Sequence, residues 1–225
     1  MESPSLRTTY LREMETLERD VLEMASRAES MVTRAVDSLY RLDTGTAREV
    51  MDEDDEIDIK EILVEQRCLK LLALQQPMAS DLREIGSVIR IITDLERIGD
   101  LAVDVAKICL KVDKEFGHTD YVDLPLMSNV ARQMLRLSTQ MFARKDIEAY
   151  QQVQALEDQV DELYRSLRDQ TFQYMLAHPE EVVAAGWLLY AVHHLERIAD
   201  HSVSIAERVV FMVTGRMAGA QEERP

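Results

Sequence analysis

The chain has 225 residues, of which 46% are hydrophobic and 30% are charged, and its formal net charge is −16 at pH 7. This size and composition are typical of a globular protein with one large domain or two small ones. The negative charge argues against nucleic acid and anionic lipid as direct partners, because both attract basic surfaces, and it favours cations or a basic protein surface.

The first half of the chain contains three segments whose apolar residues recur at helical spacing. The first segment carries its apolar stripe over residues 17–39 and is expected to end near residues 42–45, where Gly45 suits a helix C-terminus. The second is expected over residues 46–74, where it stops before Pro77. The third begins near that proline and covers residues 77–109.

A linker of small and polar residues is expected next, over residues 115–125. The fifth helix should stop before Pro179, and the sixth should fray after Gly215, so that residues 216–225 form a disordered tail. The second half thus predicts three further helices, with apolar stripes over residues 130–141, 153–171 and 188–209.

One motif occurs twice, because residues 94–107 read DLERIGDLAVDVAK and residues 194–207 read HLERIADHSVSIAE. The helices before each copy also align, so the chain is a duplicated unit. We predict an all-α fold of six helices that form two tandem, internally duplicated, antiparallel three-helix bundles, fused end to end or side by side. The first bundle is assigned to residues 1–117, the second to 118–215 and the tail to 216–225.

The repeat places a pair of acids, spaced four residues apart, on four of the six helices. Residues at this spacing lie on one face of a helix, and consecutive antiparallel helices are usually neighbours. Four carboxylates can therefore converge in each bundle. The candidate metal ligands are Asp54, Asp58, Glu96 and Asp100 in the first bundle and Glu157, Asp161, Glu196 and Asp200 in the second.

Sites built only from oxygen ligands suit hard cations such as Mg²⁺, Ca²⁺ and Mn²⁺, and also iron in carboxylate clusters. Zinc prefers Cys or His, and a His-assisted site can form only in the second half, where His193, His194 and His201 flank the motif. The alternative is a solvated acidic face without metal, in which Arg97 and Arg197 pair with acids of a neighbouring helix.

Only Cys68 and Cys109 occur, in no Cys-x-x-Cys or Cys/His pattern, so a reducing cytosol is expected rather than a disulfide framework. The N-terminal residues lack the apolar core of a signal peptide, and no stretch approaches the ~20 apolar residues of a membrane-spanning helix. We therefore expect a cytoplasmic protein without direct membrane insertion, which reaches the inner face of the membrane through partners.

These motifs resemble those of the PhoU family of phosphate-signalling regulators. The resemblance rests on LERIGD at 95–100 and LERIADH at 195–201, and it extends to DEID at 55–58, EDQVD at 157–161 and FMVTG at 211–215. It covers nearly the whole chain with the same duplication. The resemblance implies two three-helix bundles whose acidic motifs, carrying the eight acids named above, bind metal ions.

The implied cofactors are divalent or trivalent metal ions, namely iron, manganese, magnesium or zinc. The implied function is a non-enzymatic adaptor, commonly a homodimer, between the ATP-binding subunit of the phosphate transporter and the phosphate-sensing histidine kinase. Such an adaptor regulates phosphate uptake and homeostasis and represses the phosphate-starvation response. The chain departs from the family pattern at Leu101, where members often carry His, and at Asp104 and Ser204, where they often carry Asn.

Two other functions stay open at this point. A di-metal carboxylate oxidase built on a helical bundle would need Glu-x-x-His pairs, and the chain offers only Glu115 and His118, which lie in the linker. The chain also lacks a phosphate-binding P-loop and a Gly-x-Ser-x-Gly motif, so no enzymatic activity is expected. The third alternative is a structural helical scaffold that binds no metal.

Overall fold

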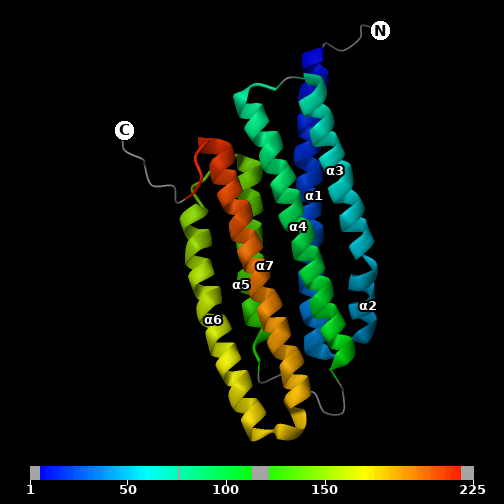
Figure 1. Cartoon of the computed structure of the whole chain (residues 1–225), viewed down its shortest axis with the longest axis vertical. Helices are drawn as coiled ribbons and strands as arrows, with labels where there is room; N and C mark the ends of the chain where they lie inside the picture. The colour runs from blue at the N-terminus through cyan, green and yellow to red at the C-terminus, as the bar shows by residue number, and fades with distance from the viewer. Residues whose placement is uncertain (1–5, 76, 113–121, 219–225) are drawn as a thin grey trace.

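The computed structural model describes residues 6–75, 77–112 and 122–218, and all regular structure in these ranges is helical (Figure 1). The predicted all-α fold is confirmed, with the six expected helices in their expected order. The elements are α1 (Leu6–Arg41), α2 (Thr44–Asp52), α3 (Asp54–Gln75), α4 (Ala79–Lys111), α5 (Leu124–Arg144), α6 (Tyr150–Ala177), the short 3₁₀ helix η1 (Pro179–Glu181) and α7 (Val182–Thr214).

The second predicted helix is not continuous, because α2 ends at Asp52 and α3 begins at Asp54. Glu53 lies at the junction and forms ion pairs with Arg27 and Arg34 of α1, which hold the break against that helix. The break gives α3 its own N-terminus, where negative charge is stabilised by the helix dipole. The first turn of α3 contains Asp54, Asp55 and Glu56.

The first helix ends beside the predicted stretch of residues 42–45, but Gly45 is not the residue that terminates it. α1 stops at Arg41, and Leu42 takes the left-handed backbone conformation, with φ of 52°. Gly45 instead lies in the first turn of α2, because the Asp43 side chain accepts hydrogen bonds from the backbone N–H groups of Gly45 and Thr46 at 3.0 and 3.2 Å. An Asp side chain that caps a helix in this way starts a new helix rather than ending the previous one.

The two bundles lie side by side, which decides between the two arrangements left open above. Figure 1 shows α1, α3 and α4 next to α5, α6 and α7, and α4 packs along α7 while α1 packs along α5. The fully buried Leu95 and Leu195 of the repeated motif belong to one continuous apolar core. The predicted boundary between residues 117 and 118 falls outside the described residues, as do residues 219–225 of the tail, and this division into domains stays a prediction.

The expected linker is shorter at its C-terminal end than predicted. α5 already begins at Leu124, and Asp123 caps it by accepting a hydrogen bond from the backbone N–H of Leu126 at 2.9 Å. The rest of the expected linker, through residue 121, lies outside the described residues. None of the described helices offers a stretch that is long and apolar enough to cross a membrane.

The close approach of α3 to α4 at Gly99 gives the first testable prediction. A Cβ atom on Gly99 would lie 3.1 Å from Cδ1 and 3.2 Å from Cγ2 of Ile57, whereas one on Gly86 would meet nothing within 4 Å. We expect Gly99→Leu to lower the free energy of unfolding by about 1–3 kcal/mol through overpacking. Gly86→Leu should raise it by roughly 0.5–1 kcal/mol, because Gly is a poor helix former.

Urea denaturation followed by circular dichroism measures both changes. Equal effects of the two substitutions would contradict the close approach of the two helices at Gly99.

Candidate metal centres

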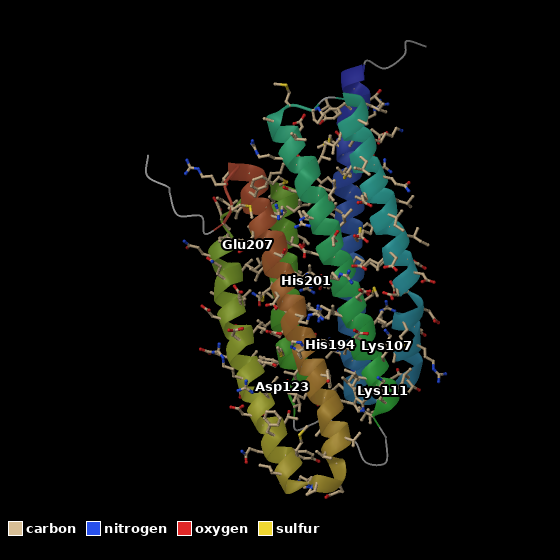
Figure 2. All side chains as sticks on the ribbon, viewed as in Figure 1. Lys107, Lys111, Asp123, His194, His201 and Glu207 are labelled. Carbon is tan, nitrogen blue, oxygen red and sulfur yellow. The ribbon has the colours of Figure 1, made fainter. Side chains whose placement is uncertain are left out.

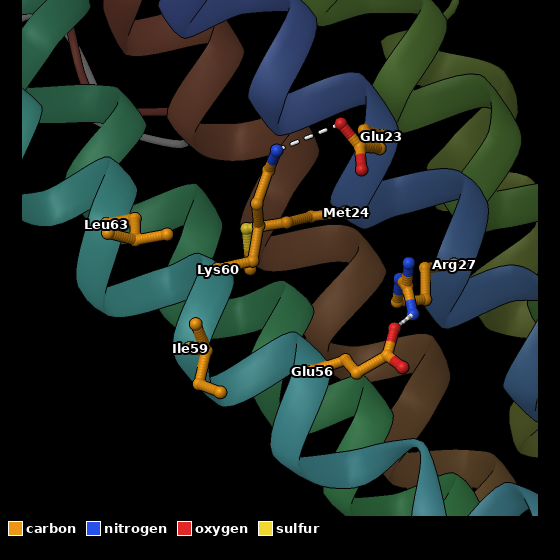
Figure 3. A pocket seen from close by; sticks show the side chains of 7 residues that line it. All are labelled: Glu23, Met24, Arg27, Glu56, Ile59, Lys60 and Leu63. Carbon is orange, nitrogen blue, oxygen red and sulfur yellow. Dashed lines mark hydrogen bonds and ion pairs between the residues drawn. The ribbon is translucent and has the colours of Figure 1, made fainter.

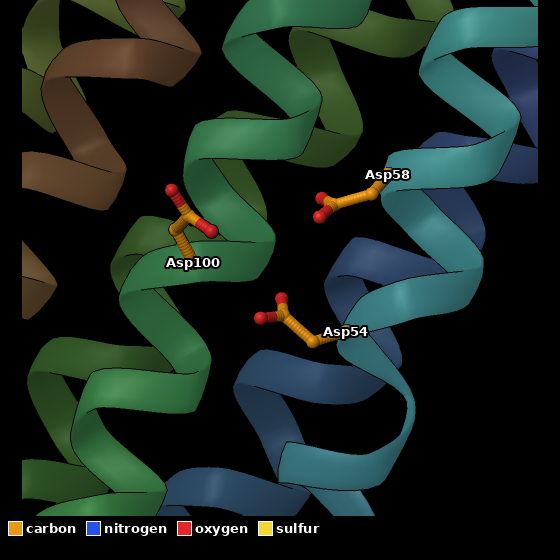
Figure 4. A group of neighbouring side chains, drawn as sticks. All are labelled: Asp54, Asp58 and Asp100. Carbon is orange, nitrogen blue, oxygen red and sulfur yellow. The ribbon is translucent and has the colours of Figure 1, made fainter.

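Three acids of the first bundle converge between α3 and α4 (Figure 4). Asp54, Asp58 and Asp100 each contribute one carboxylate oxygen, and these oxygens all lie within 4.8 Å of one another. The spacing of four residues places Asp54 and Asp58 one turn apart on the same face of α3, and Asp100 faces them from α4. Among the described side chains, no other set of three His, Cys, Asp or Glu residues reaches this spacing.

Two oxygens of this triad lack a partner in the protein. Oδ1 of Asp54 and Oδ1 of Asp58 are buried, and no described donor forms a hydrogen bond with either. A buried carboxylate oxygen without a donor costs free energy, so native structures rarely leave one in this state. A hard cation prefers oxygen ligands of this kind, and the triad therefore fits a metal ion such as Mg²⁺, Mn²⁺ or iron.

The fourth predicted acid of the first bundle, Glu96, lies close enough to feel the triad. Burial is the main cause that raises the pKa of Glu96 to about 7, and the charge of Asp100 adds to it. Burial followed by the charge of Asp100 also raises the pKa of Asp54 and of Asp58. Since each carboxylate opposes ionisation of its neighbours, the four acids together favour the uptake of protons or of a cation.

Arg97 is one cation that compensates part of this charge, and the charge of Lys107 also opposes the rise in the pKa of Asp54. Its Nε lies 3.4 Å from Oε2 of Glu96, and its guanidinium contacts Oδ2 of Asp100 at 2.9 Å. Arg97 therefore pairs with acids of its own helix, whereas the alternative considered from the sequence had it pair with a neighbouring helix. One guanidinium that is 54% exposed leaves most of the charge of four carboxylates uncompensated.

The second bundle repeats the arrangement with Glu157 and Asp161 on α6 and Glu196 and Asp200 on α7. Burial raises the pKa of Glu157 and of Glu196, and the charge of Asp200 is the next cause for both. The pKa of Asp200 is also raised, first by loss of hydration, while the nearby His201 opposes the shift. The four acids thus share one electrostatic environment, as in the first bundle.

The second set differs from the first because two separate side chains, rather than one arginine, pair with its acids. Arg165 reaches Oδ2 of Asp161 at 2.8 Å, and Nδ1 of His193 lies 3.1 Å from Oε2 of Glu196. No three of these side chains bring their oxygens within the 4.8 Å that unites the first triad. The two predicted sites are equivalent in position but not in geometry.

His201, considered above as a helper of the second site, instead contacts the first bundle. Its Nδ1 lies 2.9 Å from Oδ1 of Asp94 on α4, and the Ser204 hydroxyl donates to Oδ2 of the same carboxylate at 2.8 Å. Figure 2 shows His201 and His194 along α7, with Lys107 and Lys111 on the neighbouring α4. The sequence feature that could have indicated this contact is Asp94. It is the first residue of the repeated motif, and His194 takes its place in the second copy.

Comparison with known proteins places the chain in a family. The model of the PhoU domain matches twice, over residues 21–109 and 124–209. A PhoU homolog from Aquifex aeolicus, a phosphate-specific transport system accessory protein, is 33% identical over 210 residues, which are 93% of this chain and 95% of the relative. The homolog from Pseudomonas aeruginosa is also 33% identical, over 90% of this chain and 84% of the relative.

Two crystal structures share the fold of the whole chain. PhoU from Pseudomonas aeruginosa superposes with a TM-score of 0.87 at 32% identity, and the match covers 92% of this chain and 100% of that one. The phosphate transport system regulatory protein PhoU from Streptococcus pneumoniae gives a TM-score of 0.86 at 26% identity, covering 93% of this chain and 99% of that one. Both bundles and their arrangement are therefore common to these proteins.

The raised pKa values predict how stability depends on pH. An acid whose pKa is higher in the folded than in the unfolded state binds protons more tightly when folded, so stability falls as the pH rises through that window. For Glu96 the window runs from 4.5 to about 7. Chelator-treated protein should therefore lose unfolding free energy, by up to roughly 3 kcal/mol, between pH 4.5 and pH 8.

Glu96→Gln should flatten this dependence, and Glu49→Gln, on the exposed face of α2, should leave it unchanged. Urea denaturation at stepped pH measures the slope for all three proteins. A slope that Glu96→Gln does not change would contradict the account of the first carboxylate set.

Proposed function

The chain belongs to the PhoU family, and from this membership we propose that it is a metal-binding regulator of phosphate uptake and homeostasis. The relatives that it matches over most of its length are named as accessory or regulatory proteins of phosphate-specific transport. The family consists of regulatory accessory proteins and not of enzymes, which agrees with the prediction of no enzymatic activity and disfavours the carboxylate oxidase.

The observation that carries the metal part of the proposal is the first triad, with its two buried and unpartnered oxygens. Asp54 and Asp58 of α3 and Asp100 of α4 would hold the ion, with Glu96 beside them. A bound cation would supply the positive charge that offsets the mutual repulsion of these carboxylates. Because the ligands come from two helices, the ion would also fix α3 relative to α4.

The regulatory part of the proposal follows from charge. A chain of net charge −16 presents acidic surfaces that attract basic partner surfaces, and a multivalent cation at α3 and α4 changes that field locally. We propose that the chain docks in the cytoplasm on the ATP-binding subunit of the phosphate transporter and on the phosphate-sensing histidine kinase. Through both contacts it would restrain uptake and repress the phosphate-starvation response, while its location at the membrane would depend on these partners.

Metal content tests the first step of this proposal. Protein purified without an affinity tag or chelator should contain stoichiometric metal by mass spectrometry. The triple variant Asp54→Asn, Asp58→Asn, Asp100→Asn should lose it, while a control with four amides in the second bundle should retain more, because only the first triad converges. The control changes are Glu157→Gln, Asp161→Asn, Glu196→Gln and Asp200→Asn. Metal-free wild-type protein would instead support the metal-free scaffold.

The phenotype of a deletion tests the regulatory step. Cells without the gene should express phosphatase and take up phosphate at high rates even when phosphate is plentiful, because repression is lost. The wild-type gene should restore repression, and the triple variant should restore it only in part although it is produced at the same level. Full repression in the deletion strain would contradict the proposed role.

A further inference from the structure

The outward face of α3 exposes a continuous row of large apolar side chains. Ile59, Ile62, Leu63, Leu69 and Leu74, here called the α3 outer stripe, are between 52% and 66% exposed. α3 buries a second apolar face inside the bundle, so it is apolar on two opposite sides. A helix of this kind is normally covered on both sides, and a contiguous exposed row marks an interaction surface.

The duplication of the chain provides an internal comparison. Asp58 aligns with Asp161, and the same alignment sets the α3 outer stripe against the outer face of α6. The matching residues on α6 are Glu162, Arg165, Ser166, Phe172 and Ala177. α6 occupies the same place in its bundle but is mostly polar on this face, so the repeated fold itself does not require an apolar surface there.

The exposed residues of α3 follow the heptad pattern of a helix pair. Successive a and d positions, three and four residues apart, are occupied by Ile59, Ile62, Gln66, Leu69 and Ala73, all of them exposed. Over these two heptads the spacing of 3.5 residues matches that of a coiled-coil seam, with large apolar side chains at Ile59, Ile62 and Leu69. A single polar residue at an a position, such as Gln66, fixes the register of such a pair.

The charges beside the seam identify the occupant. Glu65 lies at a g position and Lys70 at the following e position, and both are exposed. When two copies of α3 run parallel, Glu65 of one copy meets Lys70 of the other on both sides of the seam. Antiparallel copies would instead set g positions against g positions, where the exposed Glu65 is acidic and α3 offers no basic residue at a g position, so the charges favour the parallel pair.

A cavity next to the seam offers additional apolar surface (Figure 3). It encloses about 130 Å³ between α1 and α3, and Met24, Ile59 and Leu63 form its apolar wall. At its rim, Nζ of Lys60 pairs with Oε2 of Glu23 at 2.9 Å. Because this ion pair already satisfies both charges, the apolar wall is the part left to receive a side chain from a second molecule.

We propose that a second copy of this chain covers the α3 outer stripe, and that the two α3 helices pair in parallel and in register about a two-fold axis. Such an interface is isologous, with each a and d residue of the seam facing its own equivalent. The proposal is independent of the metal centres and of the transporter, and it assigns a surface to the homodimer implied by the family resemblance.

Sedimentation velocity of the full chain tests the proposal first. Wild-type protein should sediment as a dimer, at twice the monomer mass of 25.8 kDa. Ile62→Glu with Leu69→Glu should weaken the dimer by roughly 100-fold or more, because both side chains lie in the centre of the seam. The matched control, Phe172→Glu with Leu176→Glu on α6, adds the same charge at exposed apolar positions and should remain dimeric.

Cysteine cross-linking tests whether the two α3 helices run parallel, and it introduces no charge into the seam. Ile62→Cys and Leu69→Cys should each form a disulfide between identical residues of two chains, and Phe172→Cys should not. The native Cys68 and Cys109 are buried and do not compete. Three results would overturn the proposal: a monomeric wild type, a dimer that persists in the double glutamate variant, or no cross-link at either position. A monomeric wild type would indicate instead that a helix of another protein covers the stripe.

Discussion

Repulsion between carboxylates on facing helices is the interaction on which the account of this molecule depends. The contact between α3 and α4 brings Asp54, Asp58 and Asp100 together, and Arg97 compensates only part of their charge. The same acids oppose ionisation of Glu96, whose pKa is raised to about 7. Close packing of the helices therefore holds these carboxylates near one another, and their repulsion raises the free energy of the folded state. Binding of a proton or of a multivalent cation lowers this repulsion. Gly99 makes this approach sterically acceptable, because any side chain there would press on Ile57.

The two duplicated bundles place acids at equivalent positions, but the surroundings of these acids differ between the bundles. In the first, the break at Glu53 begins a new helix at Asp54, and two carboxylate oxygens are left without donors. In the second, α6 runs without a break, and Arg165 and His193 pair with the acids. Asp94 of α4 and His201 of α7 join the two halves. Their hydrogen bond thus connects α4, which carries acids of the first set, directly to α7, which carries acids of the second set.

The sequence predicted the six helices, because apolar periodicity reports directly on helix faces. Of the eight acids that the repeated motif singled out, Asp54, Asp58 and Asp100 converge, and metal binding by all eight stays a prediction. The sequence missed the break at Glu53, since the apolar pattern continues through a junction that contains neither Gly nor Pro and is held by Arg27 and Arg34 from another helix. It also left open how the bundles associate, because the stripes of α4 and α7 show which residues are buried but not against which helix. Side-chain direction was equally inaccessible, so His201 was assigned to the acid beside it and not to Asp94.

We propose that the first carboxylate set exchanges protons for a metal ion. Titration calorimetry of chelator-treated protein with Mn²⁺, in buffers of different ionisation enthalpy, measures the number of protons released on binding. The account predicts release at pH 6, where Glu96 with its pKa of about 7 is largely protonated, and little or none at pH 8.5, where it is already ionised. Absence of binding, or binding with the same proton count at both pH values, would contradict it.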